Sequence, residues 1–299
     1  MKTKLERRNF LKQGLLVGGA MSFLSLDGIS RTTDPLNNLV LNDSLEPSNE
    51  TIKTLQSLRT IHGNFSDKEI PDEFIEQILH TSVRAANASG LQSYSIIVIR
   101  DRDKMKKVCG YAGSCMLLYC VDFNRVKSCA ESLGYTYYPD SMENYIPGCI
   151  STTVAAQTAV VAAKSLGVDS LITNGVHRGD MQRIWDLLEL PQTYCFPLLA
   201  VVLGYPNEEP AFQKGRLDGV GVIHRDKYHK LTKDEVTELT NKYDNEDLHL
   251  GLNNNWKAEG KKHYFDWLFT SWLDNSNPKT TETQIFKFMK KCGFVDLLK

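Results

Sequence analysis

The chain has 299 residues, of which 41% are hydrophobic and 24% are charged, and its formal net charge is -1. This apolar content excludes a largely disordered chain, and the near-zero charge argues against a nucleic-acid partner. After an N-terminal segment is set aside, roughly 250 residues remain, enough for one large domain or two small ones.

Two adjacent arginines stand near the start of the chain. Arg7 and Arg8 open the stretch RRNFLK, and an apolar run follows at residues 14–26. This run is shorter than the ~18 apolar residues that a membrane-spanning helix needs. We interpret residues 1–30 as a twin-arginine export signal and residues 31–49 as a polar linker, with a basic amphipathic first helix as the alternative. The first interpretation predicts export of the folded protein by the twin-arginine machinery to the periplasm, or membrane anchoring through an uncleaved leader.

In chain order, the first half of the sequence predicts a short helix at 52–59, an amphipathic helix at 71–83, a strand at 94–100, a helix at 101–108 and a strand at 115–123. The second half predicts an apolar helix at 149–166, an amphipathic helix at 180–190, a buried strand at 195–206 and a C-terminal helix at 283–294. Strands and helices do not alternate regularly, so an α+β fold is favoured over a doubly wound one. The helix at 149–166 is apolar on all sides, which predicts that protein encloses it.

The composition changes after residue 225. Residues 241–262 are polar, and the aromatic stretch YFDWLFTSWL follows them. We therefore expect a domain at 50–225 and a C-terminal extension at 226–299 that packs on this domain or on a partner subunit.

The seven cysteines form no CxxC pair, and none has a histidine at zinc-finger spacing. A metal site is therefore not predicted, and a disulfide framework is not expected at this chain length. Cys120 and Cys195 lie in apolar runs, which favours buried thiols. A nucleophilic Cys-His pair remains an alternative without a sequence signature.

Three polar patches are candidates for ligand binding. Arg59, Thr60 and His62 offer a planar cationic fork, a hydroxyl and a ring N–H within four residues, a donor set suited to a phosphate. The alternative is a solvated turn. The second patch is ANASGLQSY at 86–94, whose amides suit a heterocycle, although it also fits a polar connection. In the third, KGR at 214–216, two cations flank a glycine.

The order and context of these patches resemble the FMN-dependent nitroreductase family over residues 51–225. That fold is a central mixed or antiparallel sheet flanked by helices, with a long central dimer helix that the apolar helix at 149–166 matches. The resemblance implies that Arg59, Thr60, His62, Lys214 and Arg216 bind the FMN phosphate. It also implies a homodimer with the flavin at the subunit interface.

Two further segments match the ring end of the family's cofactor site. Gln92 and the aromatic Tyr94 match the segment that contacts the ribityl chain and flavin ring. Gly90 departs from the family's asparagine, and Asn87 is a substitute donor. Thr173, Asn174 and Gly175 stand where the family places backbone N–H groups near flavin N5 and O4.

The resemblance implies an NAD(P)H oxidoreductase in which hydride passes through flavin N5 to a nitroaromatic, a quinone or a similar acceptor by ping-pong turnover. A membrane carrier is a second candidate electron donor for an exported enzyme. The sequence also leaves open a flavin-dependent dehalogenase-like enzyme, a flavin-binding protein without turnover and a non-flavin structural protein. No catalytic acid or base is assigned, although His177 and Arg178 follow the N5 loop and are candidates to face the substrate. Because His62 replaces the more usual arginine, we expect FMN retention to weaken above about pH 7.

Overall fold

The computed structural model describes residues 47–253, 255–273 and 282–295. These residues belong to one compact unit of the chain. The predicted export signal and most of the predicted linker lie outside the described residues.

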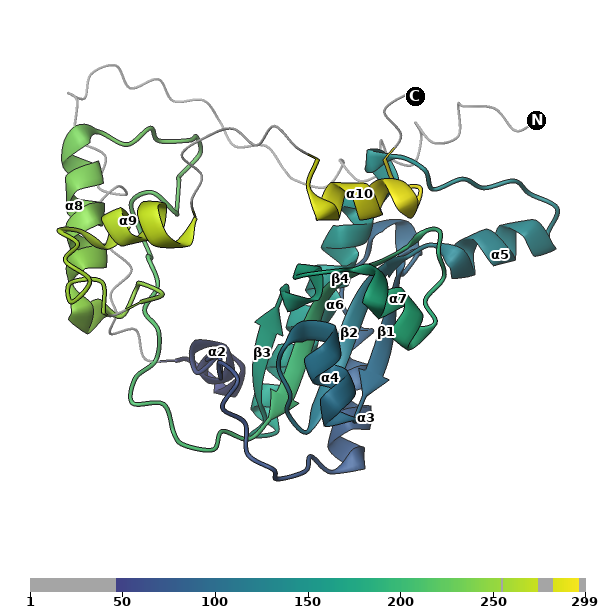
Figure 1. The fold of residues 1–299 in the computed structure, drawn as a ribbon, viewed down its shortest axis with the longest axis horizontal. Coiled ribbons are helices and arrows are strands. Elements are labelled where there is room, and N and C mark those ends of the chain that lie inside the picture. Colours follow the sequence, from purple (N-terminus) through teal and green to yellow (C-terminus); the bar gives the residue numbers. More distant parts are fainter. Residues whose placement is uncertain (1–46, 254, 274–281, 296–299) are drawn as a thin grey trace, which may run out of the picture. The chain divides into compact units, whose positions relative to one another are not determined.

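A four-stranded antiparallel sheet stands at the centre of the fold (Figure 1). Its order is β1-β2-β4-β3, with β1 at Tyr94–Ile99, β2 at Cys115–Asp122, β3 at Asp169–Thr173 and β4 at Cys195–Gly204. The predicted α+β architecture is confirmed. The sequence pattern did not predict β3, because its short run DSLIT begins with two polar residues and follows a helix-ending glycine.

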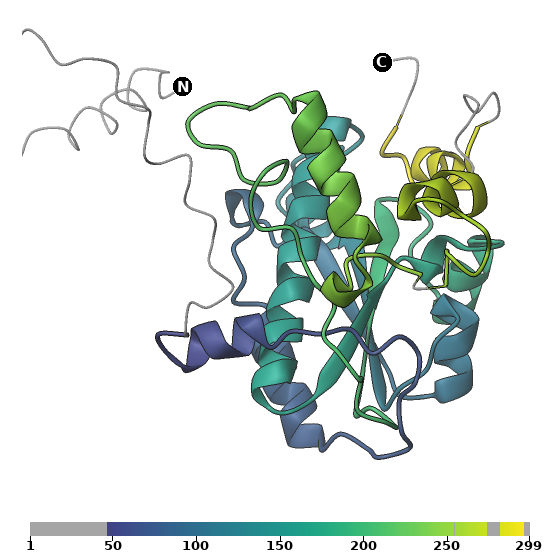
Figure 2. The ribbon, with the colours of Figure 1, turned by 90° about the vertical axis from the view of Figure 1, so that its left-hand side faces the viewer.

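Helices cover both faces of this sheet (Figure 2). One face is covered by α3 (Asp72–Ser82) and α6 (Met142–Ser165), and the other by α4 (Arg102–Cys109), α7 (Gln182–Leu188) and α10 (Gln284–Lys291). Successive side chains of a strand point to opposite faces. Leu117 and Tyr119 of β2 therefore join the α3 and α6 side, while Met116 and Leu118 join the other side. This double burial explains why β2 is apolar along almost its whole length.

The central helix α6 has 24 residues and begins at Met142, earlier than the predicted start at residue 149. Pro147 lies inside it and lacks a backbone N–H donor, which obscured the first turns in the sequence pattern. By length and composition alone α6 is apolar enough to cross a membrane. Its alanines instead pack on the sheet, as in a core helix of a globular fold.

The remaining elements are α2 (Glu50–Gln56), α5 (Asn124–Ser132) and the short turns η2 (Ala88–Gly90) and η3 (Gly175–His177). The C-terminal extension contains α8 (Lys233–Asp244), η4 (Glu246–Leu248), α9 (Tyr264–Trp267) and η5 (Leu268–Trp272). Its aromatic residues Trp256, Tyr264 and Trp267 form a separate small apolar cluster. Beyond it, α10 returns to the sheet, where Phe294 is fully buried.

Candidate functional site

Two segments that are far apart in the sequence run side by side next to the sheet. Phe65 and Pro206 form an antiparallel β-bridge. The N–H of Asn207 donates to the carbonyl of Asn64 at 2.9 Å, and the N–H of Ser66 donates to the carbonyl of Tyr205 at 2.8 Å. The structure thus aligns the segment after α2 with the segment after β4.

Gln213 extends this alignment to the predicted phosphate-binding patches. Its side-chain amide donates to the carbonyl of Gln56 at 2.8 Å and to that of Leu58 at 2.7 Å. Lys214 follows Gln213 directly, and Arg59 follows Leu58 directly. The first and third polar patches of the sequence are therefore neighbours in space.

The first patch is extended, because Thr60 bridges Ser170 of β3 and the N–H of Ile61 donates to the carbonyl of Ser170 at 3.0 Å. Side chains of an extended segment alternate between two sides. Ile61 is buried, whereas Thr60 and His62 are exposed. Thr60 and His62 therefore share the outer side, and Arg59 shares the inner side with Ile61.

The guanidinium of Arg59 is held by two carboxylates. Its Nη2 lies 2.6 Å from Asp169 Oδ2, and its Nη1 lies 2.7 Å from Glu209 Oε2. Asp169 is 4% exposed and also accepts a hydrogen bond from Lys164 at 2.8 Å. The hydrogen bonds that Arg59 donates, with that to Asp169 the strongest, raise the pKa of Arg59. The fork that the sequence pattern assigned to phosphate is thus engaged within the protein and attaches the first patch to β3.

Tyr111 supports the outer side of the first patch. Its hydroxyl lies 3.2 Å from His62 Nε2, and the two rings meet edge to face with centroids 5.4 Å apart. Gly63, at a φ of +84°, lies so close that a Cβ there would be 3.0 Å from the Tyr111 ring. Sequence reasoning missed Tyr111, because a single tyrosine between a helix and a strand carries no motif.

Lys214 and Arg216 are cations without a carboxylate partner among the residues that the structure describes. Lys214 Nζ donates to the carbonyl of Gly251 at 2.6 Å, and Arg216 donates to the carbonyl of Gly215 at 2.8 Å. Burial lowers the pKa of Lys214, and the nearby charge of Arg216 lowers it further. Two cations without a carboxylate partner on one turn form a favourable place for a phosphate.

Strand β3 connects this cationic end to the predicted N5 loop. Ser170 lies beside Thr60, and Asn174 follows the other end of the strand, about 13 Å away at the usual rise per residue. Asn174 is exposed. The N–H of Gly175 donates to Thr173 Oγ1 at 3.0 Å, and a Cβ on Gly175 would lie 2.2 Å from the Cys109 carbonyl oxygen. Only glycine fits this position.

Asn87 and Gln92 lie beside β1, at the opposite edge of the sheet from β3. Three strand spacings separate these edges, about 14 Å in total. Asn87 Oδ1 accepts the N–H of Gln92 at 3.0 Å, and Gln92 has a φ of 45°. The structure of one chain therefore does not bring the second patch together with the other candidate residues.

His177 is a structural residue in this arrangement. Its Nε2 lies 3.0 Å from the carbonyl oxygen of Pro197, so Nε2 must carry the proton, and its ring packs against Phe196. Burial lowers the pKa of His177, which favours the neutral ring. Arg178, by contrast, is exposed.

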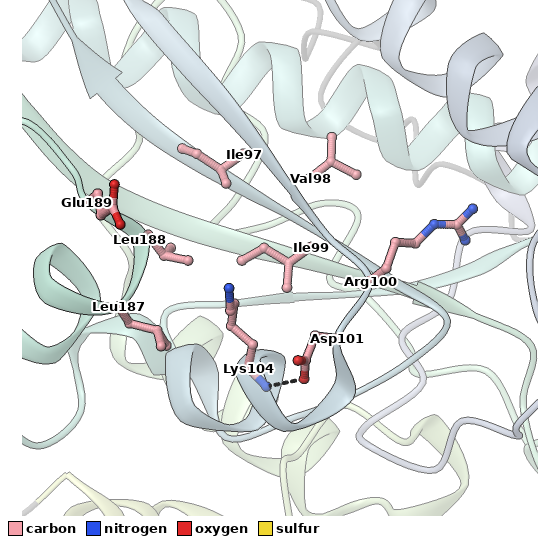
Figure 3. A pocket seen from close by; sticks show the side chains of 9 residues that line it. All are labelled: Ile97, Val98, Ile99, Arg100, Asp101, Lys104, Leu187, Leu188 and Glu189. Carbon is pink, nitrogen blue, oxygen red and sulfur yellow. Dashed lines mark hydrogen bonds between the residues drawn. The ribbon is translucent and has the colours of Figure 1, made fainter.

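Two cavities lie away from the predicted site residues. One of about 360 Å³ lies between β1, α4 and α7, where Figure 3 shows the side chains of Ile99, Lys104 and Leu187. The other, of about 810 Å³, is lined by residues of α2, α3 and α6. Neither cavity is lined by a residue that the sequence predicts to bind the cofactor.

Comparisons with known proteins agree with the fold. The model of the nitroreductase family matches residues 56–205. The chain is 33% identical over 206 residues to the FMN reductase [NAD(P)H] of Bacillus subtilis, covering 66% of this chain and 80% of that protein. It is 31% identical over 200 residues to the Cr(VI) reductase of a Pseudomonas strain, covering 64% of this chain and 79% of that protein. The structure of B. megaterium NfrA2 aligns with a TM-score of 0.69 and 26% identity, covering 82% of this chain and 98% of that one.

Proposed function

The chain belongs to the nitroreductase family, and from that premise we propose that it is an FMN-dependent oxidoreductase that uses NAD(P)H. The observation that carries the proposal is the meeting of the first and third polar patches. In the third patch, Lys214 and Arg216 donate to backbone carbonyls and have no carboxylate partner among the described residues. Thr60 and His62 lie on the exposed side of the neighbouring segment. This donor set fits the phosphate of a mononucleotide.

The residues of this chain position the cofactor. Lys214 and Arg216 supply charge to the phosphate, and Thr60 supplies a hydroxyl donor. Asn174 and Gly175, at the far end of β3, stand on the ring side. Bound FMN would supply a hydride acceptor and donor at N5, and the protein would orient the ring and exclude competing reactions.

The position of Asn87 and Gln92 supports a homodimer. They lie at the sheet edge opposite the phosphate end, so a second copy is needed to bring them to the same flavin. Helix α6 exposes an apolar stripe at four-residue spacing, in which Met142 is 42% exposed, Ile146 51%, Ile150 60% and Val154 38%. Such a stripe on one helix face is typical of a protein interface. We propose that α6 pairs with a second copy and completes two flavin sites.

The finer chemistry is ping-pong reduction of a nitroaromatic, a quinone or a similar acceptor. Ile172 is 41% exposed on β3, and Arg178 is exposed beyond η3, so the proposed ring end offers both an apolar and a cationic surface. An apolar surface suits a planar acceptor, and a cation suits its electron-rich substituents. A dehalogenase-like activity on the same flavin would share these contacts.

One measurement tests the cofactor and separates turnover from storage. The protein purified from its own host should show a flavin spectrum, and the released flavin should be FMN. Anaerobic NADH or NADPH should bleach it, and an added quinone should restore the colour. A colourless protein that does not take up added FMN contradicts the proposal, and a yellow protein that neither nucleotide bleaches supports flavin storage or another electron donor.

We also propose that the chain is exported through its twin-arginine segment. The support is the RRNFLK motif before a short apolar run. Replacement of both Arg7 and Arg8 with lysine keeps the charge and should retain the protein in the cytoplasm on fractionation. Unchanged export of this variant would exclude the twin-arginine route.

A further inference from the structure

The C-terminal extension contacts the basic turn at residues 212–216 in three places. The rings of Phe212 and His249 stack with centroids 3.7 Å apart and an interplanar angle of 8°. Lys214 Nζ donates to the carbonyl of Gly251 at 2.6 Å. Gly215 faces the carbonyl of Leu248, whose oxygen would lie 2.1 Å from a Cβ on residue 215.

The contact at Gly215 is a close approach between two backbones. A Cβ at 2.1 Å from a carbonyl oxygen cannot be relieved by turning a side chain, because the obstacle is main chain. Glycine permits such an approach because it has no side chain. Any larger residue at 215 must push the turn and the extension apart.

The extension side of this contact is anchored in the aromatic cluster. The N–H of Leu252 donates to the hydroxyl of Tyr264 at 2.9 Å, and a Cβ on Gly251 would lie 2.6 Å from the Tyr264 ring. Tyr264 is 4% exposed and packs with Trp256 and Trp267. Residues 248–252 are thus a supported surface against which the basic turn rests.

The opposite side of the basic turn is held by Gln213, which donates to the carbonyls of Gln56 and Leu58. Contacts on two sides therefore fix the backbone that carries Lys214 and Arg216. Lys214 donates one of its three N–H groups to Gly251, which leaves two for an anion. His249 Nδ1 is buried without a hydrogen-bond partner among the described residues, so the ring contributes stacking at this contact.

We propose that residues 248–252 of the C-terminal extension clamp the turn carrying Lys214 and Arg216 into a preformed phosphate site, and so make the protein select FMN over riboflavin. This inference rests on the proposed function. Two like charges on a free turn would separate, and a flexible lysine would lose conformational entropy on binding. A turn that is already fixed avoids most of this cost, which is the usual advantage of preorganisation.

The variant Gly215→Ala tests the clamp, and Gly219→Ala is its matched control. A Cβ at Gly219 meets nothing within 4 Å, whereas one at Gly215 meets the backbone of Leu248. Flavin fluorescence titration of the apoprotein should show FMN affinity about tenfold weaker in Gly215→Ala, the size of one lost charge-assisted hydrogen bond. Riboflavin affinity should not change, because riboflavin lacks the phosphate. Gly219→Ala should bind both flavins as the wild type does.

A second variant keeps the test decisive if Gly215→Ala does not fold. His249→Leu removes the stack on Phe212 without a backbone clash. It should also weaken FMN binding and again leave riboflavin binding unchanged.

Limited digestion with trypsin gives an independent measurement. FMN should slow cleavage at exposed lysines of the extension such as Lys257, and riboflavin should not.

The outcomes separate the clamp from the proposed function. Wild-type protein that binds FMN, together with variants whose FMN affinity is unchanged, overturns the clamp and leaves the proposed function in place. An equal loss of FMN and riboflavin affinity shows general damage to the site and also overturns it. A wild-type chain that binds neither flavin overturns both proposals.

Discussion

Arg59 and Asp169 form an ion pair at 2.6 Å between the segment after α2 and the first residue of β3. The carboxylate is 4% exposed and the guanidinium 23% exposed, so the pair is largely shielded from water. This pair turns Arg59 away from the exposed side and leaves Thr60 and His62 there. It is therefore a positioning contact for the proposed phosphate site.

Asp169→Asn should destabilise the fold and weaken FMN binding together. Loss of one partner from a shielded pair should cost roughly 2 kcal/mol of unfolding free energy, less than for a fully buried pair because Arg59 keeps some exposure. Glu209→Gln is the control, since Glu209 is 74% exposed and an exposed pair contributes less than about 1 kcal/mol. Urea unfolding and FMN titration measure both effects. Equal behaviour of the two variants would contradict a positioning role for Asp169.

The same carboxylate predicts a loss of stability in acid. Burial alone would raise the pKa of Asp169, but hydrogen bonds from Arg59 and Lys164 outweigh burial and lower it. Because the pKa of Asp169 is lower in the folded chain than in the unfolded chain, the ionised carboxylate stabilises the fold. This stabilisation is complete above the unfolded-chain pKa of aspartate, ~3.9, and is lost as the pH falls through the folded-chain pKa. Thermal melting below pH 4 should therefore be less steeply pH-dependent in Asp169→Asn than in wild type.

Tyr111 should position His62 for the proposed phosphate site. Its hydroxyl lies 3.2 Å from His62 Nε2, and the two rings meet edge to face. Tyr111→Phe removes this contact and should weaken FMN binding, and His62→Ala, which removes the ring itself, should weaken it at least as much. Titration of the apoprotein with FMN and with riboflavin measures both effects, and riboflavin binding should not change. Unchanged FMN affinity in His62→Ala would exclude a role for His62 at the phosphate.

The apolar stripe on α6 should control both assembly and flavin content. Ile150→Glu places a charge at the most exposed position of the stripe, where it would be buried in a dimer, and should shift the protein to monomers with little bound FMN. Val222→Glu is the control, because Val222 is 53% exposed in a connecting loop. Sedimentation velocity gives the oligomeric state, and the flavin-to-protein absorbance ratio gives the FMN content. A dimer that persists in Ile150→Glu would place the interface elsewhere.

His177 should make the fold less stable in mild acid. Burial lowers its pKa in the folded state, and the hydrogen bond to the Pro197 carbonyl only partly offsets this. The unfolded chain therefore binds the proton more tightly than the folded chain does. The stability that neutral His177 gives to the fold is complete above the unfolded pKa of ~6.5 and decreases as the pH falls below that value. His177→Gln should be less stable at pH 8 and should show a flatter stability profile between about pH 7 and 5. Urea midpoints across this range measure the difference.

The sequence alone determined the composition of the core and the identity of the cationic patches. Apolar periodicity located α3, and β-rich runs located β1, β2 and β4, because a residue's polarity largely decides whether it is buried. It also identified Lys214 and Arg216 as a pair, since charge and spacing are local properties.

Only the tertiary structure decided which of these residues face one another. The β-bridge between Thr60 and Ser170 keeps the segment extended, so the side chains of Arg59 and Thr60 point to opposite sides of it. No local sequence pattern predicted this bridge. The antiparallel order β1-β2-β4-β3 places Gln92 and Asn174 at opposite edges, a distance set by strand pairing between remote segments. The approach of Gly215 to Leu248 likewise depends on chain packing that sequence polarity does not encode.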